Sequence, residues 1–239
     1  MKKTKTIDLT KGIEVAIDEE TSVFRPTWYN VILMTAYDEG RTFVLTWDGR
    51  QLLVRRSLRE VLSQFAQDND VGECERQAIY NLVGTHKGRG YVAGHHRLVP
   101  THGTSNERVI YYMAHRLLED WSIKDDQIVV ASFRGRKRIF RIYIDTSIKT
   151  FEGILRAANQ VAEYQLDGLE WLAYNYGIKE IDERESVIYH HRLREECRQA
   201  YHQMRQAWML TVVEQVLRDY LPEEDCQEIM NRIKRNIKK

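Results

Sequence analysis

The residues of this sequence that could do chemistry are mainly cations, and they are concentrated between residues 76 and 146. This block contains twelve Lys and Arg residues against six Asp and Glu residues, a net charge of +6. The residues before it sum to −3 and those after it to −2, so a chain with a formal net charge of only +1 contains a basic centre. A basic block of this kind attracts polyanions, with nucleic acid as the foremost class.

The densest part of the block is a predicted β-hairpin with an Arg-Gly-Arg tip at residues 134–136, between strand-like segments at 128–133 and 137–144. A narrow A/T-rich minor groove has an enhanced negative potential that attracts inserted arginines, and a glycine would let the backbone lie flat against the groove floor. The alternative is that arginines of an exposed turn are simply solvated. The predicted DNA contacts of this hairpin are Arg134, Gly135, Arg136, Lys137, Arg138 and Arg141.

A second set of candidates lies in the glycine-rich segment 84–90 and the strand after it. Three glycines in seven residues allow the backbone to approach a ligand closely, and neighbouring cations suit phosphate oxygens, which position a protein without reading sequence. The predicted phosphate contacts are Lys87, Arg89 and Arg97. The alternative is that the glycines form a tight connection between strands. Four nearby histidines (His86, His95, His96 and His102) have no cysteine or carboxylate among them, so a zinc site is not expected.

The sequence carries no recognisable catalytic signature. Its glycine segment is not G-x-x-x-x-G-K-[ST], the basic block lacks the paired carboxylates of a Mg²⁺ site, and neither G-x-S-x-G nor H-E-x-x-H occurs. The three cysteines are widely spaced, which favours neither a disulfide framework nor a cysteine zinc site. We expect no catalytic residue, metal or cofactor. An enzyme that acts on nucleic acid through histidine, arginine and lysine is a remote alternative.

The elements that position the basic block begin with a predicted antiparallel meander of three strands between residues 28 and 56. The dipeptide Asp48-Gly49 is a strong signal for a hairpin turn, because a type I′ turn needs positive φ at both central residues. Ser57 and Glu60 have the spacing of a capping box and predict a helix that packs on the meander.

Hydrophobic and polar residues alternate along the returning strand of the predicted hairpin. Phe140, Ile142 and Ile144 would point one way, and Arg141 and Tyr143 the other. One face is therefore predicted to be core, and the opposite face to carry a cation and an aromatic ring.

After residue 147 the hydrophobic period becomes helical. The pattern predicts one helix over residues 151–162, a second over 167–177, a long amphipathic helix over 182–220, and a final helix whose first turn contains Pro222. The hydrophobic stripe of the long helix is either core or, because of its length, a surface that pairs with a second copy of the chain.

We predict an α+β protein, with an antiparallel β-rich domain at residues 1–146 and a helical region at residues 147–239. No apolar run approaches the roughly 20 residues that a membrane helix needs, and the N-terminal segment lacks the apolar stretch of a secretory signal. We therefore expect a cytoplasmic protein with no membrane partner.

The order of motifs along the central block carries a further expectation. The motifs are a glycine-and-basic loop at 84–90, Pro100-Thr101 followed by Ser105, an aromatic strand with Tyr111, Tyr112 and His115, a hairpin with Phe133, Gly135 and Lys137, and a helix that opens Phe151-Glu152 with Arg156 behind it. Their order over roughly residues 28–165 resembles the ComK family, the bacterial competence transcription factors. The sequence departs from that family in Val99, where phenylalanine is expected, and in Ile154, where glutamine is usual.

The resemblance implies a DNA-binding activator of genes for DNA uptake, which recognises A/T-rich half-sites largely through the minor groove. It also implies control of protein levels by an adaptor and a ClpC-type protease. A homo-oligomer would allow two half-sites to be bound at once. We predict a transcriptional regulator of this type that binds double-stranded DNA. The alternative is a non-enzymatic interaction protein whose basic face binds an acidic protein and whose long helix oligomerises it.

Overall fold

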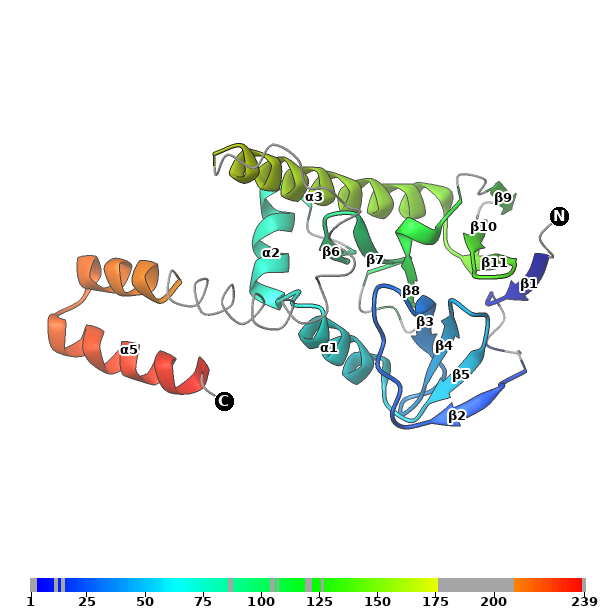
Figure 1. Ribbon diagram of the computed structural model, residues 1–239, viewed down its shortest axis with the longest axis horizontal. Coiled ribbons are helices and arrows are strands. Elements are labelled where there is room, and N and C mark those ends of the chain that lie inside the picture. Colours follow the sequence, from blue (N-terminus) through cyan, green and yellow to red (C-terminus); the bar gives the residue numbers. More distant parts are fainter. Residues whose placement is uncertain are drawn as a thin grey trace. The chain divides into compact units, whose positions relative to one another are not determined.

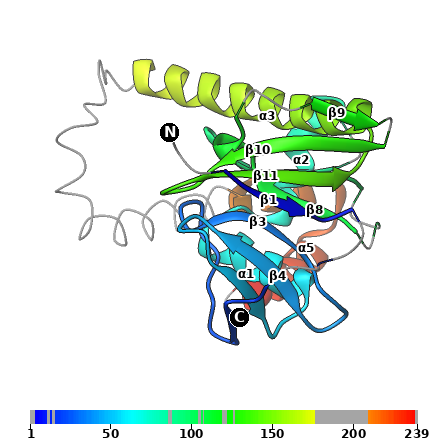
Figure 2. The same ribbon diagram turned by 90° about the vertical axis from the view of Figure 1, so that its right-hand side faces the viewer.

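The chain divides into two compact units, Met1–Tyr176 and Gly177–Lys239. The first is mixed α+β and the described part of the second is helical, so the predicted α+β class is confirmed. The change to a helical pattern after residue 146 marks the start of α3 (Ile148–Asn175), which belongs to the first unit. The computed structural model in Figures 1 and 2 describes residues 4–10, 13, 16–85, 88–103, 106, 108–118, 122–125, 127–175 and 209–237.

The larger sheet has seven strands in the order β2-β5-β4-β3-β8-β7-β6. They are β2 (Glu19–Thr21), β3 (Val31–Ala36), β4 (Thr42–Thr46), β5 (Gln51–Val54), β6 (Tyr91–Ala93), β7 (His96–Pro100) and β8 (Ile110–Met113). Strands β3, β4 and β5 form the predicted meander. In the turn between β4 and β5 Gly49 has a φ of +96° but Asp48 does not have positive φ, so the hairpin is confirmed and the predicted type I′ turn is wrong. The other pairings of this sheet are antiparallel, as predicted, but β2 pairs with β5 in parallel, so the sheet is mixed.

The smaller sheet has four strands in the order β1-β11-β10-β9. They are β1 (Thr4–Asp8), β9 (Ser122–Asp125), β10 (Ile128–Arg134) and β11 (Ile139–Asp145). Strands β10 and β11 form the predicted hairpin, and Phe140, Ile142 and Ile144 are fully buried, as their alternation indicated. Strand β1 was not predicted; it pairs in parallel with β11 and so makes this sheet mixed as well.

Helix α1 (Leu58–Asp68) begins at the predicted capping box. The Ser57 side chain accepts from the backbone N–H of Glu60, and the Glu60 carboxylate accepts from the backbone N–H of Ser57. This arrangement satisfies two N–H groups that the first turn of a helix leaves unpaired. Helix α2 (Glu73–Leu82) was not predicted, since its hydrophobic pattern is short.

Helix α3 is continuous from Ile148 to Asn175, so the predicted break near Asp167 is wrong. It is fastened to β6 by Gln165, whose Nε2 donates to the Val92 carbonyl at 3.1 Å and whose Oε1 accepts from the Gly94 N–H at 2.8 Å. Figures 1 and 2 both show β10 and β11 between α3 and the strands β3 to β5. Of the described helices, none combines the length and apolar character that a membrane span requires.

The main core lies where the inner faces of the two sheets meet α3. Phe140 from β11, Phe43 from β4 and Phe151 from α3 are all fully buried in it. A second core lies between the opposite face of the larger sheet and α1, where Phe65 packs against Trp28. The hairpin β10–β11 is thus held by a large apolar surface, and only its tip and outer face remain available to a ligand.

The described part of the second unit contains a helical stretch at residues 209–220 and α5 (Glu223–Ile237). Figure 1 shows them side by side, and the Cys226 thiol of α5 donates to the Glu214 carbonyl at 3.9 Å. The predicted final helix after Pro222 is confirmed. Most of the predicted long helix over 182–220 lies outside the described residues, and its last part, from 209 on, is helical.

Candidate nucleic-acid interface

The tip of the β10–β11 hairpin, residues 134–138, is a tight turn closed by the Gly135 N–H, which donates to the Arg138 carbonyl at 3.0 Å. Gly135 is buried, and a Cβ added there would lie 2.6 Å from a ring carbon of Phe140. The glycine is therefore required so that the tip can close over the Phe140 ring. The expectation that Gly135 itself lies against a groove floor does not fit this position.

The tip is also attached to the larger sheet. The Arg136 N–H donates to the Trp47 carbonyl at 2.8 Å, and Trp47 directly follows β4. A Cβ added to Gly49 would lie 3.0 Å from Cζ of the same Phe140 ring. Two glycines from different hairpins thus pack against one buried phenylalanine, and this packing fixes the tip in place.

Four cations project from this fixed tip. Arg134, Arg136, Lys137 and Arg138 are all exposed, and within the described part of the chain none of them forms an ion pair. Exposed cations without an ion pair among the described residues are available to attract a polyanion. Because the backbone beneath them is fixed, only side-chain freedom is lost when they bind.

Arg141 lies on the same outer face of the smaller sheet as Arg134. Arg134 pairs with Ile139 across the hairpin and Arg141 with Ser132, and residues directly opposite each other share a face. The exposed guanidinium of Arg141 therefore extends the basic surface away from the tip along β11.

The other end of the same outer face carries carboxylates rather than cations. Asp8 of β1 pairs with Tyr143 of β11, and the carboxylate of Asp145 lies 3.4 Å from the guanidinium of Arg108, which offsets its charge. The exposed cations of this face are therefore concentrated at the end that carries the tip, and a polyanion is attracted to that end.

The three predicted phosphate contacts outside the hairpin are Lys87, Arg89 and Arg97, and the two that the structure describes bind helices rather than the tip. Arg97 is half-buried and its Nη1 donates to Asn159 of α3, and burial lowers the pKa of its guanidinium. Arg89 donates from Nη2 to Asn81 of α2 at 3.2 Å. No hydrogen bond in the described part of the chain joins either arginine to the tip, and Lys87 lies outside the described residues.

The glycines of segment 84–90 contact the protein itself. A Cβ added to Gly88, whose φ is +64°, would lie 2.7 Å from Ile154 of α3, and one added to Gly90 would lie 2.6 Å from the Leu98 carbonyl. These close approaches correspond to the alternative interpretation of the segment, a tight connection between elements. Arg89 and Arg97 hold α2 and α3 beside it.

Arg116 extends the basic surface beyond the residues that were predicted. It ends the 3₁₀ turn Ala114–Arg116, and its Nη2 donates to the Tyr29 carbonyl at 2.6 Å and to the Trp28 carbonyl at 3.4 Å. Its guanidinium lies over the Trp47 ring, 5.1 Å from the centroid. Trp47 thus accepts a hydrogen bond from the tip through its carbonyl and stacks with the Arg116 guanidinium through its ring. The sequence showed Arg116 as basic but gave no sign of this pairing, which depends on sheet order.

Two histidines pack beside Arg116. His96 stacks on Trp28 with ring centroids 5.6 Å apart, and the His115 ring meets His96 edge-on at 5.2 Å. The Nε2 of His115 donates to the Trp28 carbonyl at 3.1 Å. Burial lowers the pKa of His115 to about 4, with Arg116 and His96 adding repulsion, and burial also lowers the pKa of His96. Both rings are therefore neutral at neutral pH.

This cluster predicts that the fold loses stability as the pH falls through the window between 6.5 and about 4. In that window the unfolded chain binds a proton on His115 and the folded chain does not, so protonation favours unfolding. Since solvent partly reaches the ring, we expect a loss of about 1 to 2 kcal/mol. Urea unfolding at pH 7.0, 6.0 and 5.0 measures it.

His115→Gln is the matched variant, since its amide can donate to the Trp28 carbonyl but does not titrate. Its stability should change less between pH 7 and 5 than that of the unsubstituted protein. An identical pH dependence of the two proteins would show that His115 is not the group responsible.

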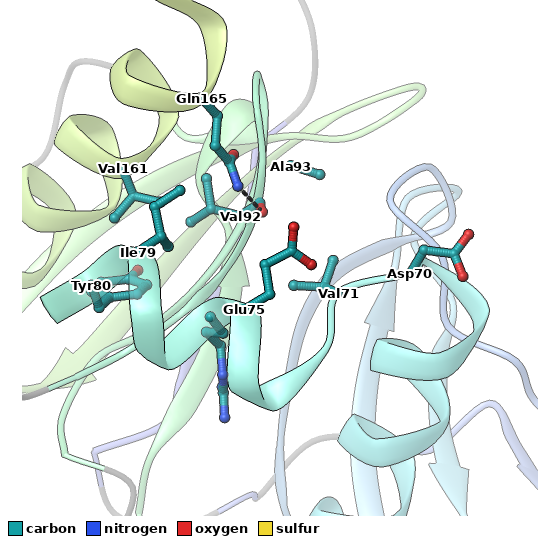
Figure 3. Close-up of a pocket in the computed structure, with 10 residues that line it drawn as sticks. Asp70, Val71, Glu75, Ile79, Tyr80, Val92, Ala93, Val161 and Gln165 are labelled. Carbon is teal, nitrogen blue, oxygen red and sulfur yellow. Dashed lines mark hydrogen bonds between the residues drawn. The ribbon is translucent and has the colours of Figure 1, made fainter. Parts of the chain in front are cut away.

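A small cavity lies between α2, α3 and β6 (Figure 3). Its volume is about 80 Å³, and its lining includes Glu75, Tyr80 and Gln165, with the hydrogen bond from Gln165 to Val92 at one side. Binding sites for small molecules generally measure about 300–1,000 Å³, so this cavity is too small for one. The described residues also contain no group of three or more metal-ligating side chains.

The basic tip and the Arg116–Trp47 pair are therefore the strongest candidate for a functional site in the described part of the chain. The attached tip combines exposed cations with a backbone that other parts of the fold hold in place. No family model matches the chain, and comparison with curated proteins and with solved structures likewise gave no match.

Proposed function

We propose that this protein is a DNA-binding transcriptional regulator of the competence-factor type, which binds A/T-rich double-stranded DNA through the tip of the β10–β11 hairpin. The observation that carries the proposal is the attachment of the tip: the hydrogen bond from Arg136 to Trp47 and the buried Phe140 ring hold four exposed cations in a fixed arrangement. Arginine side chains presented on a narrow support suit insertion into a narrow minor groove.

The side chains, rather than the glycine backbone, would enter the groove. Arg134 and Arg136 are exposed and flank the buried Gly135, so their guanidinium groups, and not the glycine, are available to a ligand. Lys137, Arg138 and Arg141 would then contact phosphates on either side, positioning the protein without reading bases.

The test is fluorescence anisotropy of the purified protein on an A/T-tract duplex and a matched G/C duplex across a salt series. Each phosphate that is neutralised contributes about −0.9 to the slope of log K against log salt, so four tip cations predict a slope of about −3 to −4. We expect tighter binding to the A/T duplex that survives competitor DNA.

Absence of binding to either duplex at low salt would overturn the proposal and direct the search to an acidic protein partner. Equal affinity for the two duplexes would retain DNA as the ligand but reject the minor groove as the place where sequence is read.

A further inference from the structure

Four side chains beside the tip form a continuous surface that combines aromatic rings with a cation. They are Tyr29, Trp47, His96 and Arg116, and we call them the aromatic platform. Tyr29 is 56% exposed and Trp47 36% exposed, which is unusual for large rings in a chain whose cores are otherwise well filled.

Contacts in the structure join the platform into one unit. Arg116 donates to the Tyr29 carbonyl at 2.6 Å while its guanidinium lies 5.1 Å from the centroid of the Trp47 ring. The Tyr29 hydroxyl lies 3.2 Å from Nε2 of His96, and the two rings meet edge-on at 5.2 Å. The rings are therefore held in place before any ligand arrives.

The platform is continuous with the basic tip. Trp47 accepts from the Arg136 N–H through its carbonyl, so one residue supports the tip with its backbone and carries a ring of the platform with its side chain. The carboxylate of Asp48, the residue after Trp47, lies 3.1 Å from the guanidinium of Arg50, which offsets its charge. A polyanion bound at the tip would therefore lie beside the aromatic rings of the platform.

Exposed rings interleaved with cations are the arrangement that binds unpaired nucleotides. Every base has a π-face that can stack on an aromatic ring, whereas the bases of an intact duplex are already stacked on one another. The fixed guanidinium of Arg116 can accompany such a base, either by stacking or by contacting its phosphate.

We propose that the aromatic platform stacks unpaired bases that adjoin a duplex held by the tip. The preferred ligand would then be double-stranded DNA with a single-stranded flank rather than a blunt duplex. This inference rests on the proposed function, because the tip must hold the duplex part of the ligand.

The experiment compares three ligands for the full chain by fluorescence anisotropy at one salt concentration. They are a blunt A/T-tract duplex, the same duplex with a flank of five unpaired thymidines, and the same duplex with a flank of five abasic residues. The two flanks carry the same phosphates and differ only in their bases. We expect the thymidine flank to bind about tenfold more tightly than the abasic flank, the effect of stacking one or two bases.

Two substitutions at Trp47 locate the effect, since both keep the backbone carbonyl that supports the tip. Trp47→Leu should abolish the difference in affinity between the thymidine and abasic flanks, whereas Trp47→Phe should retain part of the difference.

Equal affinity of the unsubstituted protein for the two flanked ligands, with the blunt duplex still bound, would overturn the platform and leave the proposed function standing. Failure to bind any of the three ligands would remove the proposed function itself. A Trp47→Leu protein that is folded but still prefers the thymidine flank tenfold would also overturn the assignment.

Discussion

Replacing Arg134 and Arg136 together by glutamate is expected to lower the affinity for an A/T-tract duplex by about 100-fold at 0.1 M salt. A cation in the groove also neutralises the phosphates beside it, so each arginine that is lost removes close to a tenfold gain from counterion release at that salt concentration, and the new carboxylates repel the backbone. The slope of log K against log salt should become shallower by about 1.8. Both side chains are exposed and neither forms an ion pair in the described part of the chain, so the fold should be unaffected.

The matched control is Arg59→Glu combined with Arg156→Glu. These two arginines are exposed on α1 and α3, and the double substitution changes the net charge by the same amount. A general effect of charge would weaken binding equally in both proteins. Unchanged binding by the Arg134→Glu, Arg136→Glu protein, with thermal unfolding like that of the unsubstituted chain, would mean that the tip does not contact DNA.

The features that could be predicted from the sequence are those that depend on neighbours in the chain. The place of the hairpin turn at Asp48-Gly49 was correct, although its type was not, and Ser57 with Glu60 forms the capping box that its spacing indicated. The alternation around Arg141 was likewise correct, because a period of two allows only one arrangement of core and surface on a strand.

Capping-box spacing was a less reliable guide to where a helix begins or ends, because a helix can continue through residues that have this spacing. Asp167 and Glu170 have the spacing of a capping box, yet α3 continues through them. Nothing lies within 4 Å of a Cβ added to Gly168, so the glycine sits in an exposed helix interior, where it costs only about 1 kcal/mol relative to alanine. The stabilisation that α3 gains from packing on the sheets is larger than this cost.

The site itself depends on contacts between distant parts of the chain, which periodicity does not specify. The hydrogen bond from Arg136 to Trp47 and the stacking of Arg116 on the same residue exist because two sheets bring their hairpins together. Gly135 was predicted as a DNA contact because of its conformational freedom, whereas the structure shows that a Cβ there would collide with the Phe140 ring.

Phe140→Ala is expected to lower the free energy of unfolding by about 3 to 5 kcal/mol and to release the tip from the larger sheet. The ring is fully buried, and its removal leaves a cavity that the backbone around it can fill only in part. Because Gly49 and Gly135 both approach this ring closely, its loss also removes the surface against which both turns pack. Urea unfolding measures the first effect, and hydrogen exchange of the Arg136 amide measures the second.

Phe65→Ala separates the two effects, because this ring is also fully buried but lies in the second core against Trp28. Phe65→Ala should lower the free energy of unfolding by a similar amount. The Arg136 amide should then exchange only through global unfolding of the chain. In Phe140→Ala the Arg136 amide should exchange faster than global unfolding allows, and duplex affinity should fall about tenfold because the tip must be ordered on binding.

If Phe140→Ala proves too unstable to purify, Phe140→Leu makes a smaller cavity at the same place. Equal protection of the Arg136 amide in the Phe65 and Phe140 variants, relative to their global stabilities, would show that the hydrogen bond to Trp47 fixes the tip without the ring.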